Sequence, residues 1–234
     1  MAGGNLTLAQ LQTAVRQRSD METSGFISDS ELTSYINQSY FELYDILVQK
    51  YGNEYFVASP YSFTSDGVLE AYPLPADFYK FLGLDVQIGS SPSGWISVKP
   101  FMFAERNQWN APNIQLVYGQ TNVRYRLRAD SIWLTPLASG GQNFRVWYVP
   151  KLDELVSDSD EATGVSGWLE YIIVDAAIKC LQKEESDVSV LMAQKQALIA
   201  RIEAAAENRD QGNPQTVSDT SFSLNGFNGG FGVV

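Results

Sequence analysis

Apolar positions recur every three to four residues in two stretches of the first region, residues 1–55, which is the period of an amphipathic α-helix. Each stretch opens with the spacing of a capping box, Thr7 with Gln10 and Ser28 with Glu31. The pattern predicts a short helix over residues 8–18 and a long one over 29–51. Their apolar faces carry Leu8, Leu11, Val15, Leu32, Ile36, Leu43 and Leu47.

The helical period disappears between residues 56 and 150, where short runs of β-branched and aromatic residues alternate with Gly, Pro, Ser and Asn. Most connections are too short for the crossovers that parallel pairing needs, so we expect mainly antiparallel strands. Asp77 is expected to cap a short turn over residues 78–82. The predicted strands are 68–71, 82–88, 96–99, 114–118, 124–127, 131–134 and 143–149, typical of a small sandwich or barrel.

Helical periodicity returns near residue 166, and two apolar stripes separated by a polar stretch predict an αα-hairpin. The stripes are Leu169, Ile172, Ile173, Ala176, Cys180 and Leu181, then Leu191, Leu198, Ile202 and Ala205. Neither pair of helices can bury its stripes alone. We therefore expect an α+β fold in which residues 1–55 and 151–208 form a four-helix bundle and residues 56–150 are an inserted antiparallel β domain. Tyr55 and Pro150 should then lie close together.

The last segment, residues 209–234, is rich in glycine and too poor in apolar residues to build a core of its own. We expect this C-terminal arm to extend and dock on a neighbouring surface, either another copy of the chain or a second protein. Its predicted contact residues are Phe222, Leu224, Phe227, Phe231, Val233 and Val234.

Charge and residue inventory exclude several classes of protein. Acidic residues outnumber basic ones by 27 to 16, and a net charge of −11 is the wrong sign for tight binding to nucleic acid. Histidine is absent and Cys180 is the only cysteine, which excludes Ser-His-Asp triads, Cys-His dyads and imidazole-ligated zinc. The first residues lack the pattern of a signal peptide and no run approaches 18 apolar residues, so we expect cytoplasmic synthesis and no membrane partner.

Carboxylates are the remaining candidates for chemistry. Glu105 and Asp130 are the acids best placed for glycoside hydrolysis, but no second acid recurs near them, so we interpret them as structural or rim charges. The acids at 158–161 and 184–187 lack the ligand spacing of a calcium loop. No glycine-rich phosphate loop is present. We expect no catalytic residue, no cofactor and no metal site.

The alternating arginines and the five tryptophans each allow a binding role as an alternative to a structural one. Arg124, Arg126 and Arg128 alternate, so in a strand they share one face, which we interpret as a solvated face rather than a contact for DNA or an acidic partner. The tryptophans Trp95, Trp109, Trp133, Trp147 and Trp168 favour core and interface packing, although some could stack on a sugar. A carbohydrate-binding β module, or a tail-associated glycan-binding protein, is therefore the alternative function.

Several motifs, in order along most of the chain, resemble head-to-tail adaptor (connector) proteins of tailed bacteriophages. They are Tyr-Pro-Leu-Pro-Ala-Asp-Phe at 72–78, Pro-Phe-Met-Phe-Ala-Glu-Arg-Asn at 100–107, Phe-Arg-Val-Trp-Tyr-Val-Pro at 144–150, and the helical segment 168–187. The chain is similar in particular to the tail tubular protein A-type adaptors of short-tailed phages.

The resemblance implies a structural virion protein of the phage neck, forming a ring, commonly of twelve copies, beneath the portal. It also implies contacts with the portal protein and with a tail or nozzle protein, and an arm that reaches the portal. Double-stranded DNA would pass through the channel without tight binding, which the acidic balance of the chain suits.

Overall fold

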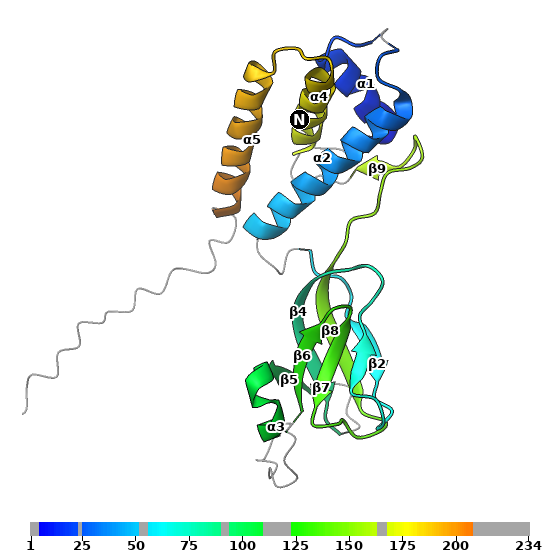
Figure 1. Cartoon of the computed structure of the whole chain (residues 1–234), viewed down its shortest axis with the longest axis vertical. Coiled ribbons are helices and arrows are strands. Elements are labelled where there is room, and N and C mark those ends of the chain that lie inside the picture. Colours follow the sequence, from blue (N-terminus) through cyan, green and yellow to red (C-terminus); the bar gives the residue numbers. More distant parts are fainter. Residues whose placement is uncertain are drawn as a thin grey trace, which may run out of the picture.

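A helical unit and a β unit are joined end to end in the computed structural model, which describes residues 5–22, 25–51, 56–89, 94–109, 123–162 and 168–207 (Figure 1). The fold is α+β, as predicted. The chain leaves the helical unit after its second helix, forms the β unit, and returns for the last two helices (Figure 1).

Four helices make up the helical unit, and α4 lies at its centre. The helices are α1 (Leu8–Arg18), α2 (Asp29–Lys50), α4 (Leu169–Lys183) and α5 (Ser189–Glu207). Helix α4 contacts the other three and has ten of its fifteen residues buried. Helix α5 is more peripheral, with only Leu198 and Ile202 fully buried among its described side chains. A two-stranded ribbon, β1 (Leu6–Thr7) with β9 (Glu161–Ala162), joins the first helix to the return segment.

The predicted helix starts are confirmed by their caps. The Thr7 hydroxyl accepts a hydrogen bond from the Gln10 backbone N–H (3.3 Å), while the Gln10 side chain accepts one from the Thr7 N–H (3.0 Å). Ser28 caps α2 in the same way, accepting from the Glu31 N–H at 3.3 Å. Polar side chains therefore set where both helices begin.

The β unit is one curled sheet of seven strands, in the order β2-β8-β4-β5-β6-β7-β3. Its strands are β2 (Tyr61–Thr64), β3 (Ala71–Pro73), β4 (Phe78–Gln87), β5 (Trp95–Pro100), β6 (Arg124–Arg128), β7 (Ser131–Thr135) and β8 (Asn143–Pro150). Pairing is antiparallel except between β5 and β6, which are parallel over two residue pairs. The predicted strand 114–118 lies outside the described residues.

Two details of the strand prediction are wrong. Residues 78–82 belong to the long strand β4 rather than to a capped turn, because they pair with β8 across the middle of the sheet. The Asp77 carboxylate instead accepts from the Tyr148 hydroxyl at 3.1 Å. Strand β3 begins only at Ala71, because the Asp66 carboxylate accepts from two backbone N–H groups and holds residues 66–69 in a turn.

Each unit has its own hydrophobic core, and Tyr44 connects them. The Tyr44 hydroxyl donates to the Pro150 carbonyl (2.6 Å), and its ring lies 5.1 Å from that of Phe56. Tyr55 lies outside the described residues, but its neighbour Phe56 and Pro150 line the same junction cavity of about 250 Å³. The β unit is thus held against the end of α2 by a small aromatic contact.

Candidate functional site

The described residues of the β unit form a cleft lined by basic and aromatic side chains. One side of the cleft is a short turn that follows β5. This turn consists of the 3₁₀ segment η1 (Phe103–Glu105) and the short helix α3 (Arg106–Trp109). The Glu105 carboxylate accepts from the Met102 N–H (3.4 Å) and the Glu105 N–H donates to the Met102 carbonyl (2.8 Å). Glu105 therefore shapes the turn, which agrees with its structural interpretation.

Three arginines surround the turn and stack on aromatic rings. The guanidinium carbon of Arg106 lies 4.6 Å from the centroid of the Phe103 ring, and that of Arg126 lies 5.7 Å from the same centroid. On the adjacent strand pair, Arg128 lies 3.9 Å from the centroid of Trp133. These distances are those of cation–π contacts, in which each guanidinium lies over the face of a ring.

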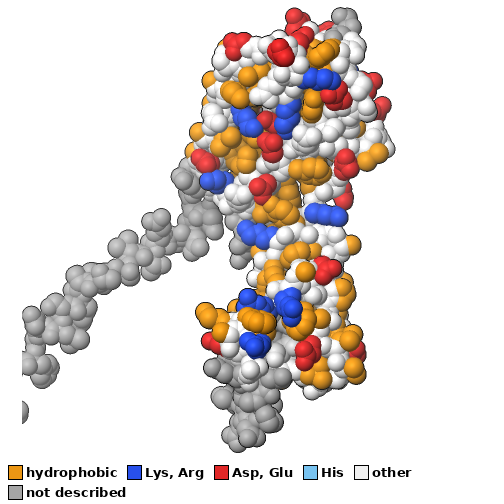
Figure 2. All heavy atoms as spheres, viewed as in Figure 1, with side chains coloured by type: hydrophobic (Ala, Val, Ile, Leu, Met, Phe, Trp, Pro, Cys, Tyr) orange, Lys and Arg blue, Asp and Glu red, His pale blue; other side chains and the backbone are white. Residues whose placement is uncertain are grey.

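The cleft between these side chains has a volume of about 140 Å³. It is lined by Glu70, Phe101, Phe103, Arg106, Asn107, Arg126, Arg128, Trp133, Leu134 and Thr135. Figure 2 shows basic side chains gathered beside hydrophobic ones near the turn of the β unit. Arg126 and Arg128 share a face of β6, as the alternation predicted, whereas Arg124 does not line the cleft.

A second polar cluster is centred on Asp85 and crosses three strands of the sheet. Its carboxylate accepts from the Arg145 Nε (2.9 Å), the Trp147 Nε1 (2.8 Å) and the Ser97 hydroxyl (2.9 Å). Burial alone would raise the pKa of Asp85. The hydrogen bonds from Trp147, Arg145 and Ser97 lower it by more than burial raises it, so the net pKa lies below its usual value. The cluster bonds three neighbouring strands through side chains, which indicates a structural role.

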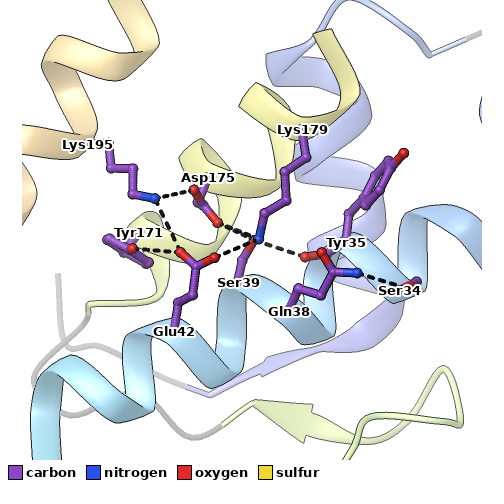
Figure 3. A network of polar contacts seen from close by, with 9 residues as sticks. All are labelled: Ser34, Tyr35, Gln38, Ser39, Glu42, Tyr171, Asp175, Lys179 and Lys195. Atoms are coloured by element: carbon purple, nitrogen blue, oxygen red, sulfur yellow. Dashed lines mark hydrogen bonds and ion pairs between the residues drawn. The ribbon is translucent and has the colours of Figure 1, made fainter. Parts of the chain in front are cut away.

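A third cluster joins α2, α4 and α5 around Asp175 (Figure 3). The Asp175 carboxylate is 2% exposed and accepts from Lys179 (2.8 Å), Lys195 (2.6 Å) and the Ser39 hydroxyl (2.7 Å). Glu42 pairs with the same two lysines at the edge of the cluster. Each buried charge is therefore paired, and the cluster fastens the peripheral helix α5 to the centre of the unit.

A family model described as SU10 adaptor protein matches residues 6–218. The chain belongs to the SU10 adaptor protein family. No curated protein matches the chain. The family is one of phage head-to-tail adaptors, so the resemblance seen in the motifs is confirmed.

Membership of the SU10 adaptor family indicates a structural protein of the bacteriophage. It also implies a place in the virion neck, association with portal and tail proteins, and oligomerisation. In the described part of the chain, no helix is long and apolar enough to span a bilayer.

The tryptophans of this SU10 adaptor, which the sequence left as possible sugar-stacking residues, contact other side chains of the chain where they are described. Trp95 and Trp147 lie beside the guanidinium of Arg145, at 4.4 and 5.0 Å, and the Trp168 indole donates to the Tyr51 hydroxyl at 2.9 Å. The Trp109 side chain lies outside the described residues. Trp133 lies against Arg128, so each of the four tryptophans whose side chains the structure describes contacts a side chain of this chain.

The acidic loops of the adaptor bind their own backbone. Asp160 accepts from the N–H groups of Val156 and Ser157 (2.8 Å each), and Asp187 accepts from the Ser189 N–H (2.9 Å) at the start of α5. Asp130 lies at the exposed β6–β7 turn. No group of three His, Cys, Asp or Glu side chains able to hold a metal ion occurs within the described ranges.

The predicted contacts of the C-terminal arm lie outside the described residues. They are Phe222, Leu224, Phe227, Phe231, Val233 and Val234. They also lie beyond residue 218, where the match to the SU10 adaptor family ends. Their role rests on composition and spacing.

Sequence reasoning missed the two carboxylate clusters and the cleft. Asp175 sits within the apolar stripe of α4 with Lys179 one turn later, and that placement is the signal that could have marked a buried pair. The alternation of Arg126 and Arg128 is visible in the sequence. Arg106 comes from a turn that is distant in sequence, and no local pattern links this turn to β6.

Proposed function

We propose that this protein is a subunit of an adaptor ring in the phage neck that joins the portal to the tail and extends the DNA channel. The observation that carries the proposal is the family match over residues 6–218, which spans both the helical unit and the β unit. An adaptor must present two faces to two different proteins. A molecule with two units joined end to end suits that task (Figure 1).

In this proposal the four helices act as a bundle that keeps each subunit rigid within the ring. The described residues place their buried charges in paired clusters that brace helices and strands, around Asp175 and Asp85. The partners of Asp175 and Asp85 come from neighbouring helices and strands, so both clusters tie elements of the fold together. Rigid bracing without chemistry is what a connector needs.

The acidic balance supports a channel that DNA can pass through. Each chain carries a formal charge of −11, and a ring of twelve copies would multiply that charge twelvefold. Acidic residues along the lumen repel phosphates and keep DNA from adhering to the wall. Passage during genome ejection requires such weak interaction.

The C-terminal arm, residues 209–234, is proposed to clamp the portal. Spaced aromatic and aliphatic residues in a glycine-rich segment can contact a partner at several points, and a ring multiplies these weak contacts by its copy number. The domains of the proposal are the helical bundle (1–55 and 151–208), the inserted β domain (56–150) and this arm.

Deletion of residues 211–234 tests the clamp. We expect the truncated protein to lose co-sedimentation with purified portal, and the replacement of Phe222, Phe227 and Phe231 by Ser to have the same effect. Replacement of Asn225 and Asn228 by Ser is the matched control and should leave binding intact. Undiminished binding of the truncated chain would refute the clamp, and full-length protein that binds neither portal nor tail protein would refute the adaptor ring.

A further inference from the structure

The cleft on the β unit is distinguished by three guanidinium groups gathered around one hollow. Ion pairs engage Arg16, Arg18, Lys50, Arg145, Lys179, Lys183 and Lys195. Within the described residues, Arg106, Arg126 and Arg128 form no ion pair. The lack of an ion pair alone does not set them apart, since Lys80, Lys99, Lys151 and Arg201 also form none among the described residues. Glu70 is the one carboxylate among the residues that line the cleft, against three guanidinium groups.

The guanidinium groups are held in place by rings and carbonyls rather than by acids. Arg106 donates to the Phe103 carbonyl (3.0 Å) and Arg126 donates to the Phe101 carbonyl (3.4 Å), while the guanidinium carbon of Arg128 lies 3.9 Å from the centroid of the Trp133 ring. Arginine has five N–H donors, so these contacts leave most of them available. The three side chains are therefore positioned to receive a carboxylate with little further ordering.

Apolar side chains lie beside these donors. Phe103, which lines the cleft, is 49% exposed, and Met102, which precedes it in the chain, is 69% exposed. Figure 2 shows hydrophobic and basic side chains side by side at this end of the molecule. The surface thus combines charge with an apolar contact, as sites for acidic peptides do.

A nucleic acid fits this surface less well than a peptide does. A volume of about 140 Å³ accommodates a single side chain, not a tract of backbone with several stacked bases. The Glu70 carboxylate and the overall charge of −11 oppose any anion, and they oppose a nucleic acid more strongly because its backbone brings one charge with every phosphate. An acidic polypeptide, by contrast, can insert one side chain and pair its neighbours.

We propose that the cleft of Phe103, Arg106, Arg126, Arg128 and Trp133 binds an acidic segment of a partner protein in the neck, with a carboxylate beside an apolar side chain. The apolar side chain enters the hollow beside Phe103, and the carboxylate pairs with the two guanidinium groups of β6. The identity of the partner as a neck protein rests on the proposed function, whereas the peptide chemistry rests on the cleft alone.

A labelled peptide tests the chemistry with the full-length chain. The probe is a fluorescein-labelled synthetic peptide in which Glu and Phe alternate, and its binding is followed by fluorescence anisotropy at low salt. We expect the double variant Arg126→Ala with Arg128→Ala to weaken binding at least tenfold, and the corresponding double Lys variant to recover only part of it. Lys151→Ala, an exposed cation outside the cleft, is the control and should change affinity less than twofold.

Three measurements separate the outcomes. Thermal unfolding shows that each variant is folded, and Arg106→Ala serves where loss of the Trp133 contact unfolds the double variant. Binding of a 20-base-pair DNA duplex, lost in the same variants while the peptide does not bind, would overturn the proposal in favour of nucleic acid. Equal peptide binding by the wild type and the double variant would also overturn it.

Co-sedimentation with purified portal and tail proteins links the cleft to the neck. We expect the double variant to lose one of these two partners and to keep the other. If the wild type binds both partners and the double variant does so equally well, the cleft proposal fails while the adaptor function stands. If the wild type binds neither partner but binds the peptide, the adaptor function fails and the peptide chemistry of the cleft stands.

Discussion

Asp175 is the most buried charged residue of its cluster, with a side chain 3% exposed against 18% for Lys179, 24% for Lys195 and 46% for Glu42. Its oxygens are satisfied by two lysines and a serine at 2.6 to 2.8 Å. Burial raises the pKa of Asp175, but the hydrogen bonds from Lys179, Lys195 and Ser39 lower it more, so the net pKa lies below its usual value. The charged form is the one that the fold stabilises.

Removal of this carboxylate should destabilise the protein strongly. Asp175→Ala leaves two lysines without their central partner, and breaking a buried ion pair costs about 3 to 5 kcal/mol. Glu42→Gln is the matched control, because Glu42 contacts the same lysines from a side chain that is 46% exposed and should cost about 1 kcal/mol or less. Urea unfolding measures both, and equal costs would contradict the central role of Asp175.

The same residue makes stability depend on pH in the acid range. A carboxyl whose folded pKa lies below its unfolded value of about 3.9 stabilises the fold above that value, and the contribution is lost as pH falls through the folded pKa. We therefore expect the free energy of unfolding to decrease below about pH 4, and to decrease less steeply in Asp175→Asn. Denaturant midpoints between about pH 6 and pH 3 measure this, and parallel curves for the two proteins would show that other acids dominate.

Cys180 illustrates a titratable group kept inert. Its side chain is 1% exposed on α4, and burial raises the pKa of the thiol to about 11. Because the thiolate is the reactive form, the native protein should resist iodoacetamide at about pH 8 and react only after unfolding in urea. Mass spectrometry before and after denaturation checks this, and rapid labelling of the folded chain would contradict the burial of Cys180.

At the scale of the element, the local sequence determines the bounds of a helix more fully than those of a strand. The helix α1 begins and ends where its apolar period and capping box place it. Strand β2 (Tyr61–Thr64) was not predicted: its aromatic and polar residues alternate, but a run of four is too short to stand out from a loop, and pairing with β8 defines it. The turn predicted after Asp77 fails for the same reason, since β4 owes its length to the strand beside it.

The candidate site likewise has one feature that the local sequence predicts and one that depends on strand pairing. The alternating Arg126 and Arg128 reveal their shared face in the sequence, because a strand places every second residue on one side. The approach of Arg126 to Phe103 requires the parallel pairing of β5 with β6 over Lys99 and Pro100, which follows from no local signal. The face could be predicted, whereas the cleft could not.

Helix packing supplies a prediction for α4 and α5. Ile173 and Leu198 are each 8% exposed in the core of the helical unit, so each change to Ala should cost about 2 to 5 kcal/mol. Val190→Ala, on the first turn of α5 and 67% exposed, is the matched control and should change stability by about 0.5 kcal/mol or less. Chemical denaturation measures all three, and a small effect at Leu198 would mean that α5 packs elsewhere.

At the scale of the whole molecule, the two units have separate cores and meet through few side chains. Tyr44 carries much of this contact, and burial raises the pKa of its hydroxyl to about 12, so it stays protonated and donates to Pro150. Interfaces of this modest kind allow neighbouring units to shift relative to each other. An adaptor that bridges two different rings benefits from such a joint, because its two faces need not follow the same geometry.

Charge governs how copies of the whole molecule come together in the proposed ring. Each carries −11, and like charges at a shared boundary repel over a Debye length of about 10 Å at 0.1 M salt, which shrinks to about 3 Å at 1 M. Self-association should therefore strengthen as NaCl rises from about 0.05 to about 0.5 M. Sedimentation velocity measures the assembled fraction, with sucrose as an uncharged control for solvent effects. Dissociation on adding salt would mean instead that ion pairs between copies outweigh their net repulsion, with the unpaired arginines of the cleft as the first groups to test by charge reversal.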